Sequence, residues 1–478
     1  MKYDVIVIGA GVVGPCISTA LSRQGKKVLV VERDWSKPDR IVGELLQPGG
    51  VKALKELGMI QCINNIDAVD VTGYYIQYFN HHISIDYPLK EITEVTNPLN
   101  ILDEKETQLK SDNTINKEVW DNDKRVRGVA FHHGDFLQNL RSVCKKENDT
   151  LEATVTKLIY EDDTVVGVEI KEKNGKTRKI YSKLVISCDG IYSKFRKQYS
   201  NNIPTIGSYF IGLYLKNAKL PENNKGHVLL GNHAPVLIYQ VSPTETRVLC
   251  AYRSTKPPSS ANDEVYKYLK NEVLPNIPKE TLPAFQSALE LKKFRIMPNQ
   301  YLSAKKQNQK GFLLLGDSLN MRHPLTGGGM TVGISDCVLL ARLFKSIDDF
   351  EDYDQVKEKV TIFHRKRKNL DAVINTLSIA LYSLFAADKK ALKILQYGCF
   401  RYFQRGGECV SGPIGLLSGM LPFPMLLFNH FFSVAFYSIY LNFINRGINF
   451  PLAIWECFEV LFTAIIIFTP YLWTELVQ

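Results

Sequence analysis

The first sixty residues carry the hydrophobic pattern of a βαβ unit. An apolar strand pattern over residues 3–8 stops at a glycine turn, residues 9–14 (GAGVVG), and a helical pattern follows over 14–24. A second apolar run, 27–32, leads through a loop into another helical pattern over 49–57. A βαβ unit pairs its two strands in parallel, so the pattern predicts a parallel sheet.

Further apolar runs predict the rest of the sheet structure. Residues 151–190 alternate as short strands and end in a buried strand that runs into the turn Cys188-Asp189-Gly190. Strands over 209–215, 236–241 and 246–252 suit a separate sheet on the substrate side. Another apolar strand breaks at Gly316-Asp317, and a glycine turn then opens a helix that runs to Phe344. The chain therefore returns to its first domain after the second sheet.

This order predicts an α/β fold, with a Rossmann-like nucleotide-binding domain, an inserted β-sheet substrate domain and carboxyl-terminal membrane-associated helices. The expected segments are the first domain, first part (1–88), a polar and flexible insertion (89–128), the first domain, second part (129–200), the substrate-binding sheet domain (201–300), the first domain, third part (301–368), and a helical membrane-anchoring region (369–478).

The last hundred residues differ in composition from the rest of the chain. No Asp, Glu, Lys or Arg occurs between Glu408 and Arg446, and residues 425–444 reach the length of a bilayer-crossing helix, about 20 residues. Residues 452–473 are also apolar, but Glu456 and Glu459 make a full crossing costly. We expect two helices that dip into one leaflet of a lipid bilayer. The alternative is that they are buried helices of a soluble domain.

Composition narrows the classes of function. A chain of 478 residues that is 45% hydrophobic should form two or three packed units. The net charge of +10 is spread among acidic residues, so no nucleic-acid partner is expected.

The nine cysteines form no Cys-x-x-Cys pair, which predicts reduced thiols and no metal site. A strand follows Met1 almost at once and leaves no room for a signal peptide, so we expect the catalytic part to face the cytosol.

The first glycine turn has the spacing of a dinucleotide site. Gly9 permits the tight turn, Gly11 lets the backbone approach a pyrophosphate, and Gly14 lets the helix pack against the strand. Glu32 ends the second strand 23 residues after Gly9, where an acidic side chain can bind a ribose diol. A chance glycine turn and a solvated strand end are the alternatives. The pattern therefore predicts FAD or NAD.

The two later turns favour FAD. An NAD dehydrogenase of this fold needs no second and third turn that returns to the cofactor, whereas Cys188-Asp189-Gly190 and Gly316-Asp317 supply both. Each turn alone could be an ordinary loop after a strand, because Asp-Gly and Gly-Asp are common turn residues.

Several longer stretches resemble one family over nearly the whole chain. They are 32–34 (ERD), 38–50 (PDRIVGELLQPGG), 131–134 (FHHG), 193–197 (SKFRK), 313–317 (LLLGD) and 321–332 (MRHPLTGGGMTV). The sequence resembles FAD-dependent monooxygenases built like aromatic hydroxylases and, within them, the squalene monooxygenase (squalene epoxidase) family. Asp135 departs from the pattern, because the family usually has a basic residue there. The 89–128 insertion and the lack of an amino-terminal membrane segment are further departures.

The resemblance implies a set of site residues. The expected FAD contacts are Gly9, Gly11, Val12, Val13, Gly14, Glu32, Arg33, Arg40, Leu45, Arg141, Val155, Gly316, Asp317 and Met330. Tyr74 matches the family's active-site tyrosine, and Gln47 matches a glutamine that meets its hydroxyl. The alternatives are that Tyr74 is a structural buried tyrosine, and that Arg141 is a surface helix residue.

The resemblance also implies an activity. It is the conversion of squalene and O₂ to (S)-2,3-epoxysqualene in sterol biosynthesis, with electrons from NADPH through a membrane-bound flavoprotein reductase. The location it implies is the endoplasmic reticulum (microsomal) membrane. Two rivals remain: a flavin monooxygenase or reductase that acts on another polyprenoid, and a non-catalytic prenyl-binding escort protein.

Overall fold

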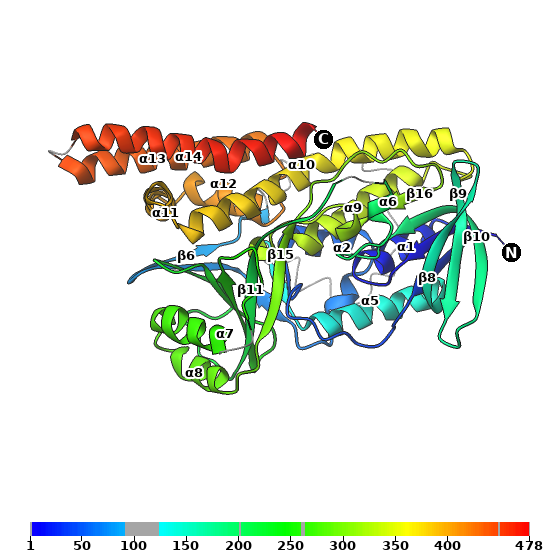
Figure 1. Cartoon of the computed structure of the whole chain (residues 1–478), viewed down its shortest axis with the longest axis horizontal. Helices are drawn as coiled ribbons and strands as arrows, with labels where there is room; N and C mark the ends of the chain where they lie inside the picture. Colours follow the sequence, from blue (N-terminus) through cyan, green and yellow to red (C-terminus); the bar gives the residue numbers. More distant parts are fainter. Residues whose placement is uncertain (1, 91–123, 200–201, 260–262, 448–449, 478) are drawn as a thin grey trace.

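A parallel sheet forms the base of the fold. The computed structural model describes residues 2–90, 124–199, 202–259, 263–447 and 450–477 (Figure 1). Strands β1 (Tyr3–Ile8) and β2 (Val28–Glu32) flank helix α1 (Val13–Arg23) and pair in parallel. The predicted βαβ unit is confirmed. Both strands are almost wholly buried, which explains why their sequences read as continuous apolar runs.

Three long strands extend this sheet. They are β8 (Asp149–Glu161), β9 (Thr164–Glu172) and β10 (Thr177–Ser187). The prediction of short strands over this region was wrong, because each of β8 and β10 serves two sheets. The first residues of β8 pair in parallel with β2, and the last residues of β10 pair in parallel with β1. Their other ends pair antiparallel with β9.

The return to the first domain is also present. Strand β16 (Phe312–Leu314) pairs in parallel with β10, and helix α9 (Gly329–Phe344) packs against α1 and α2 (Pro48–Glu56). Helix α5 (His133–Glu147) covers α1 as well. A small sheet of β3 (Leu45–Leu46), β4 (Val69–Val71) and β7 (Gly128–Ala130) joins this domain to the next.

The second sheet has seven strands and draws on two parts of the chain. Its order is β15 (Arg295–Tyr301), β11 (Thr205–Lys216), β14 (Glu245–Tyr252), β13 (Val236–Gln240), β12 (Lys225–Leu230), β5 (Gly73–Tyr78) and β6 (His81–Asp86). Strands β5 and β6 lie within the segment 1–88 that the sequence assigned to the first domain. They belong to this sheet because β5 pairs in parallel with β12, a long-range pairing that local patterns do not reveal.

The two faces of this sheet have different partners. On β11, Ile211, Leu213 and Leu215 pack against α7 (Glu264–Tyr268) and α8 (Leu282–Glu290). Phe210 points to the opposite face, where it joins an apolar cluster with the carboxyl-terminal helices. Figure 1 shows these helices and the α7–α8 pair on opposite sides of the sheet. Alternation along each strand therefore separates a structural core from the side that faces the helices.

Five helices make up most of the described part of the chain after residue 352. They are α10 (Tyr353–Ala386), α11 (Lys390–Phe403), α12 (Glu408–Leu417), α13 (Pro424–Arg446) and α14 (Phe450–Val477). Helix α10 runs without a break through the expected boundary at residues 368 and 369. The composition changes there because the amino-terminal half of this one helix is charged and its carboxyl-terminal half is apolar. Helices α13 and α14 lie side by side along one edge of the molecule (Figure 1).

Burial distinguishes these helices from one another. Three described helices are long and apolar enough to cross a membrane. The apolar window of α10 is 72% buried within the protein, whereas those of α13 and α14 are only 22% and 28% buried. The low burial of α13 and α14 favours membrane association of these two helices over the alternative of buried helices in a soluble domain.

Two buried glutamates fix which side of α14 faces the protein. Glu456 accepts hydrogen bonds from Arg446 (2.5 Å) and Asn442 (2.8 Å) and forms an ion pair with Lys390 (2.6 Å). Near the other end, Glu475 accepts from the Tyr301 hydroxyl (2.7 Å). Both glutamates are 1% exposed. Glu456 is thus turned to the protein, and only Glu459 of the two charges noted in the sequence is exposed.

Two further predictions concern the insertion and the cysteines. Residues 91–123 of the predicted 89–128 insertion lie outside the described residues. The described ends meet, because Leu89 and Arg125 form an antiparallel bridge. All nine cysteines are unpaired, and seven of them are buried.

Candidate active site

The three glycine motifs meet at the carboxyl ends of the parallel strands. Gly9 has a φ of +97°, and a Cβ atom there would lie 2.6 Å from the carbonyl oxygen of Cys188. A Cβ atom on Gly316 would lie 2.9 Å from the Val13 side chain. Turns far apart in the sequence are therefore in contact, and no larger residue fits at either point. The carboxyl edge of a parallel sheet is the usual place for a ligand site in such folds.

Two helices begin at this edge with open amino termini. Helix α1 starts after Val12 and α9 starts after Gly328. Among the described residues, neither helix has a side-chain cap or an acidic residue in its first turn. The unpaired backbone N–H groups and the positive end of each helix dipole favour an anionic ligand.

The space beside these turns fits a large polar cofactor. Cβ atoms placed on Gly11 and Gly329 would meet no described atom within 4 Å. Nearby, Nε of Arg322 and the hydroxyls of Thr326 and Thr331 are buried without a hydrogen-bond partner. Buried polar groups are rarely left unpaired, so open space with unused donors beside it is what a bound dinucleotide would satisfy.

Glu32 and Arg141 hold the first turn. Glu32 accepts a hydrogen bond from the backbone N–H of Ala10 (2.6 Å), and Arg141 donates to the carbonyl of Ala10 (2.9 Å) and to that of Ser36 (2.7 Å). Arg141 is 5% exposed. The alternative that it is a surface helix residue is therefore wrong.

The remaining expected cofactor residues lie around the same edge. Val155 is buried on β8, whereas Arg33 and Arg40 are exposed on the segment after β2. Asp317 is exposed to solvent on one side. The surrounding protein desolvates its carboxylate and raises its pKa, while the positive charges of Arg322, Arg40 and Arg196 act in the opposite direction. Asp189 is turned to its own loop, where it accepts from Ser187 and from the backbone of Lys194.

Two segments that are expected to contact the flavin lie against each other. Cβ atoms placed on Gly327 and Gly43 would lie 3.3 Å from Leu45 and 3.8 Å from the sulfur of Met330, respectively. These contacts bring the 43–47 segment against the glycine turn at 326–330. The unusual Asp135 forms an ion pair with Lys37 (2.6 Å), so its negative charge is compensated locally.

Gln47 and Tyr74 do meet, and Tyr87 joins them. The Gln47 amide nitrogen donates to the Tyr74 hydroxyl (2.6 Å) and to the carbonyl of Thr326 (2.7 Å). The Tyr87 hydroxyl donates to the amide oxygen of Gln47 (2.6 Å). Gln47 and Tyr87 are fully buried, and burial raises the pKa of Tyr74. Sequence reasoning missed Tyr87; the alternation along 81–87, which makes a hairpin with β5, was the signal that could have found it.

A buried ion pair, also missed, ties the 41–47 segment to the second sheet. Arg247 donates two hydrogen bonds to Glu44, at 2.7 and 2.8 Å, and both residues are 1% exposed. The Tyr214 hydroxyl donates to Glu44 (3.0 Å), and its ring lies 3.4 Å from the Arg247 guanidinium carbon. The partners are 203 positions apart, which no local pattern can connect.

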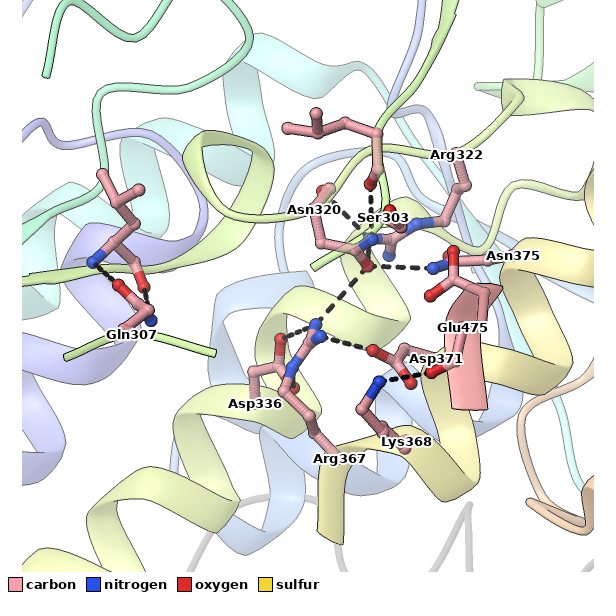
Figure 2. A network of polar contacts seen from close by, with 12 residues as sticks. Ser303, Gln307, Asn320, Arg322, Asp336, Arg367, Lys368, Asp371, Asn375 and Glu475 are labelled. Carbon is pink, nitrogen blue, oxygen red and sulfur yellow. Dashed lines mark hydrogen bonds and ion pairs between the residues drawn. The ribbon is translucent and has the colours of Figure 1, made fainter. Parts of the chain in front are cut away.

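A second buried polar network supports the loop that follows Asp317 (Figure 2). Arg367 on α10 forms ion pairs with Asp336 (2.7 Å) and Asp371. The side-chain oxygen of Asn320 accepts from Arg322 (2.6 Å) and from Asn375 (3.1 Å). Lys368 of α10 donates to the backbone carbonyl of Glu475 (2.5 Å). Figure 2 therefore places α9, α10 and the end of α14 around one loop of the site.

Two buried histidines brace the same region. His133 donates from Nδ1 to the Gly43 carbonyl (2.9 Å), and desolvation lowers its pKa to about 4. His323 accepts from the backbone of Leu325 (3.2 Å) and faces the Ser208 hydroxyl (2.9 Å), and desolvation lowers its pKa to about 3. Both are neutral near pH 7. No cluster of three or more metal-ligating side chains occurs in the parts of the chain that the structure describes.

Solved structures of flavin-dependent enzymes share this fold. The flavin-dependent brominase Bmp2 superimposes with a TM-score of 0.66 at 13% identity, over 90% of this chain and 98% of that chain. Pseudomonas aeruginosa PqsL superimposes with a TM-score of 0.61 at 16% identity, over 81% of this chain and 97% of that chain. The model for an FAD binding domain matches residues 2–126. The chain thus has the aromatic-hydroxylase-like fold with an FAD-binding domain.

Sequence comparisons define the family within that class. The squalene epoxidase family model matches residues 181–455, more than half of the chain. Squalene epoxidase of Candida albicans is 68% identical over 100% of this chain and 99% of that protein. The Saccharomyces cerevisiae squalene epoxidase is 48% identical over 100% of this chain and 97% of its own length. Squalene monooxygenase of Mus musculus is 37% identical over 99% of this chain and 78% of its own length. The chain belongs to the squalene epoxidase family.

Replacement of Arg367 tests the network of Figure 2. Arg367→Leu leaves Asp336 and Asp371 buried without their cation, and we expect a loss of about 3–5 kcal/mol in the free energy of unfolding. Arg365→Leu on the exposed side of the same helix should change it by less than about 0.5 kcal/mol. Thermal unfolding in detergent measures both; equal effects would contradict a structural role for the network.

The two histidines predict a pH dependence of stability. Their folded pKa values lie below the ordinary 6.5, so the unfolded chain binds more protons than the folded chain below pH 6.5. Stability should therefore fall as the pH is lowered from 6.5 to 5, by roughly 2 kcal/mol for each histidine. His133→Gln or His323→Gln should flatten the pH profile of the melting temperature, whereas exposed His81→Gln should not. An unchanged profile in both variants would refute the explanation.

Proposed function

We propose that this protein oxidises squalene with O₂ and NADPH-derived electrons to (S)-2,3-epoxysqualene in sterol biosynthesis. One observation carries the proposal beyond family membership: a single apolar cluster extends from the active-site tyrosine to the uncovered helix pair. It includes Tyr74, Leu325, Phe400, Val434 and Val460. We propose that the hydrocarbon is bound among the side chains of this cluster, between the uncovered helix pair and Tyr74.

The residues present suit FAD. We propose as its contacts Gly9, Gly11, Val12, Val13, Gly14, Glu32, Arg33, Arg40, Leu45, Arg141, Val155, Gly316, Asp317 and Met330. The open helix amino termini would take the pyrophosphate, and the exposed Asp317 carboxylate would accept from hydroxyls of the ribityl chain. When bound and reduced, FAD with O₂ supplies an electrophilic oxygen atom.

The chain's own tasks follow from the substrate. Squalene has no charge and no acidic proton, so no general base is needed. Apolar side chains orient one terminal double bond and exclude water. Tyr74 stays protonated because burial raises its pKa, and its hydroxyl is the polar group that we assign to the reacting end of the substrate.

The membrane contact is proposed to be the exposed apolar face of the α13–α14 pair. We define this face by Met425, Phe436, Tyr440 and Ile444 of α13 and by Trp455, Phe458, Phe462 and Trp473 of α14, all more than half exposed. Since both buried glutamates lie on the other side of α14, the pair would lie in one leaflet. We further propose an endoplasmic reticulum membrane, a cytosolic catalytic domain and a membrane-bound NADPH-dependent flavoprotein reductase.

The activity assay combines membranes that contain the protein with squalene, NADPH and a flavoprotein reductase. We expect 2,3-epoxysqualene as the product, and slow NADPH oxidation by the purified protein without the reductase. Epoxidation of another polyprenoid but not of squalene would favour the first rival. A colourless preparation that releases no FAD on denaturation would favour the escort protein.

Tyr74→Phe tests the active-site assignment. We expect the variant to fold and to keep FAD, but to lose at least about tenfold in epoxide formation, because the hydroxyl near the reacting end is removed. The buried Gln47 N–H loses its acceptor, so the melting temperature should fall. The measurement is epoxide formed per bound flavin. Turnover equal to that of the unmodified protein would make Tyr74 a structural residue.

Removal of apolar side chains tests the membrane face. The triple variant Trp455→Ser, Phe458→Ser, Phe462→Ser should bind phospholipid vesicles at least about tenfold more weakly, because each side chain contributes apolar burial. The control replaces three equally exposed apolar residues elsewhere, Tyr192, Ile203 and Leu291, by serine. Vesicle flotation compares the two; equal binding would rule out this face as the anchor.

A further inference from the structure

The orientation of the Gln47 side chain is fixed by a backbone carbonyl. The Gln47 amide nitrogen lies 2.7 Å from the carbonyl oxygen of Thr326, which can only accept a hydrogen bond. If the amide were turned over, two acceptor oxygens would face each other in a fully buried place. The nitrogen therefore faces Thr326 and Tyr74, and the amide oxygen faces Tyr87.

This orientation decides which hydroxyl donates. The amide oxygen of Gln47 accepts the proton of Tyr87 at 2.6 Å. The second hydrogen of the amide nitrogen goes to the Tyr74 oxygen, also at 2.6 Å. Tyr74 thus accepts from Gln47 and cannot use its own proton there.

The proton of Tyr74 is left for a ligand. The Tyr87 oxygen lies 3.4 Å from the Tyr74 oxygen, beyond the usual O–H···O range of about 2.5–3.0 Å. No other described residue offers Tyr74 a hydrogen-bond acceptor at shorter distance. Tyr74 lies in the apolar cluster assigned above to squalene, and it is 7% exposed.

We propose that Tyr87 is a positioning residue that acts through Gln47 to direct the Tyr74 proton to the oxygen of the epoxide. This inference rests on the proposed function, since it names the atom that accepts the hydrogen bond from Tyr74. Squalene has no hydrogen-bond acceptor, whereas its epoxide has one. The enzyme should therefore distinguish the two ligands by one hydrogen bond.

A binding experiment without turnover tests this. The FAD-loaded, oxidised enzyme in detergent is titrated with squalene and with 2,3-epoxysqualene, and the fluorescence change gives both dissociation constants. We expect the epoxide to bind about fivefold more tightly than squalene, as one neutral hydrogen bond provides. Tyr74→Phe should bring the ratio of the two constants close to one.

The decisive variant is Tyr87→Phe, which keeps the Tyr74 hydroxyl. Without Tyr87 the buried amide oxygen of Gln47 lacks a donor. The amide is then held less firmly, and so is the Tyr74 hydroxyl that accepts from it. The ratio should therefore fall at least about twofold, and Gln47→Leu, which removes the link itself, should also lower it. Tyr75→Phe, a tyrosine equally buried on the same strand, serves as the control and should keep the ratio.

The outcomes separate the two levels of the proposal. A wild-type ratio in Tyr87→Phe and Gln47→Leu, with a ratio near one in Tyr74→Phe, overturns the positioning role of Tyr87. A wild-type ratio in Tyr74→Phe overturns the assigned direction of the proton. If neither ligand binds to the unmodified enzyme, the proposed function itself fails.

Discussion

The buried ion pair between Glu44 and Arg247 is the interaction on which the site depends. It joins the segment 41–47 to strand β14 of the seven-stranded sheet, 203 positions further along the chain. Desolvation of both charges is costly. It is compensated by the two short hydrogen bonds from Arg247 to Glu44, and by the Tyr214 hydroxyl and ring, which contact Glu44 and Arg247 respectively. A buried pair of this kind adds little net stability, but separating the partners would leave two uncompensated buried charges. Gln47 is therefore held three residues away from an anchored point.

The same logic applies at the membrane side. Helix α14 is apolar on nearly all sides, so hydrophobicity alone would let it rotate about its axis. Glu456 and Glu475 remove that freedom, because each finds its partners only on the protein side. The orientation of the exposed apolar face is thus set by buried charges and not by the apolar residues that form it.

Local patterns predicted the parts of the fold that local physics determines. The βαβ opening, the strand at β16 and the long apolar helices are visible in the sequence because periodicity and glycine turns act over a few residues. The three glycine motifs also converge as expected, since parallel strands present their carboxyl ends at one edge. Gln47 and Tyr74 were predicted as site residues from the family resemblance, and in the structure they are hydrogen-bonded to each other.

What the sequence did not reveal depends on pairings between distant residues. Strand β5 belongs to the second sheet only through β12, some 150 positions later, and Tyr87 reaches Gln47 only because β6 folds back on β5. Such contacts leave no periodic trace. They nevertheless decide the chemistry: a carbonyl at Thr326 fixes an amide, the amide fixes two hydroxyls, and one proton remains for the ligand. In a site for a hydrocarbon, where few polar groups are present, the direction of a single O–H bond is the feature by which the product can be told from the substrate.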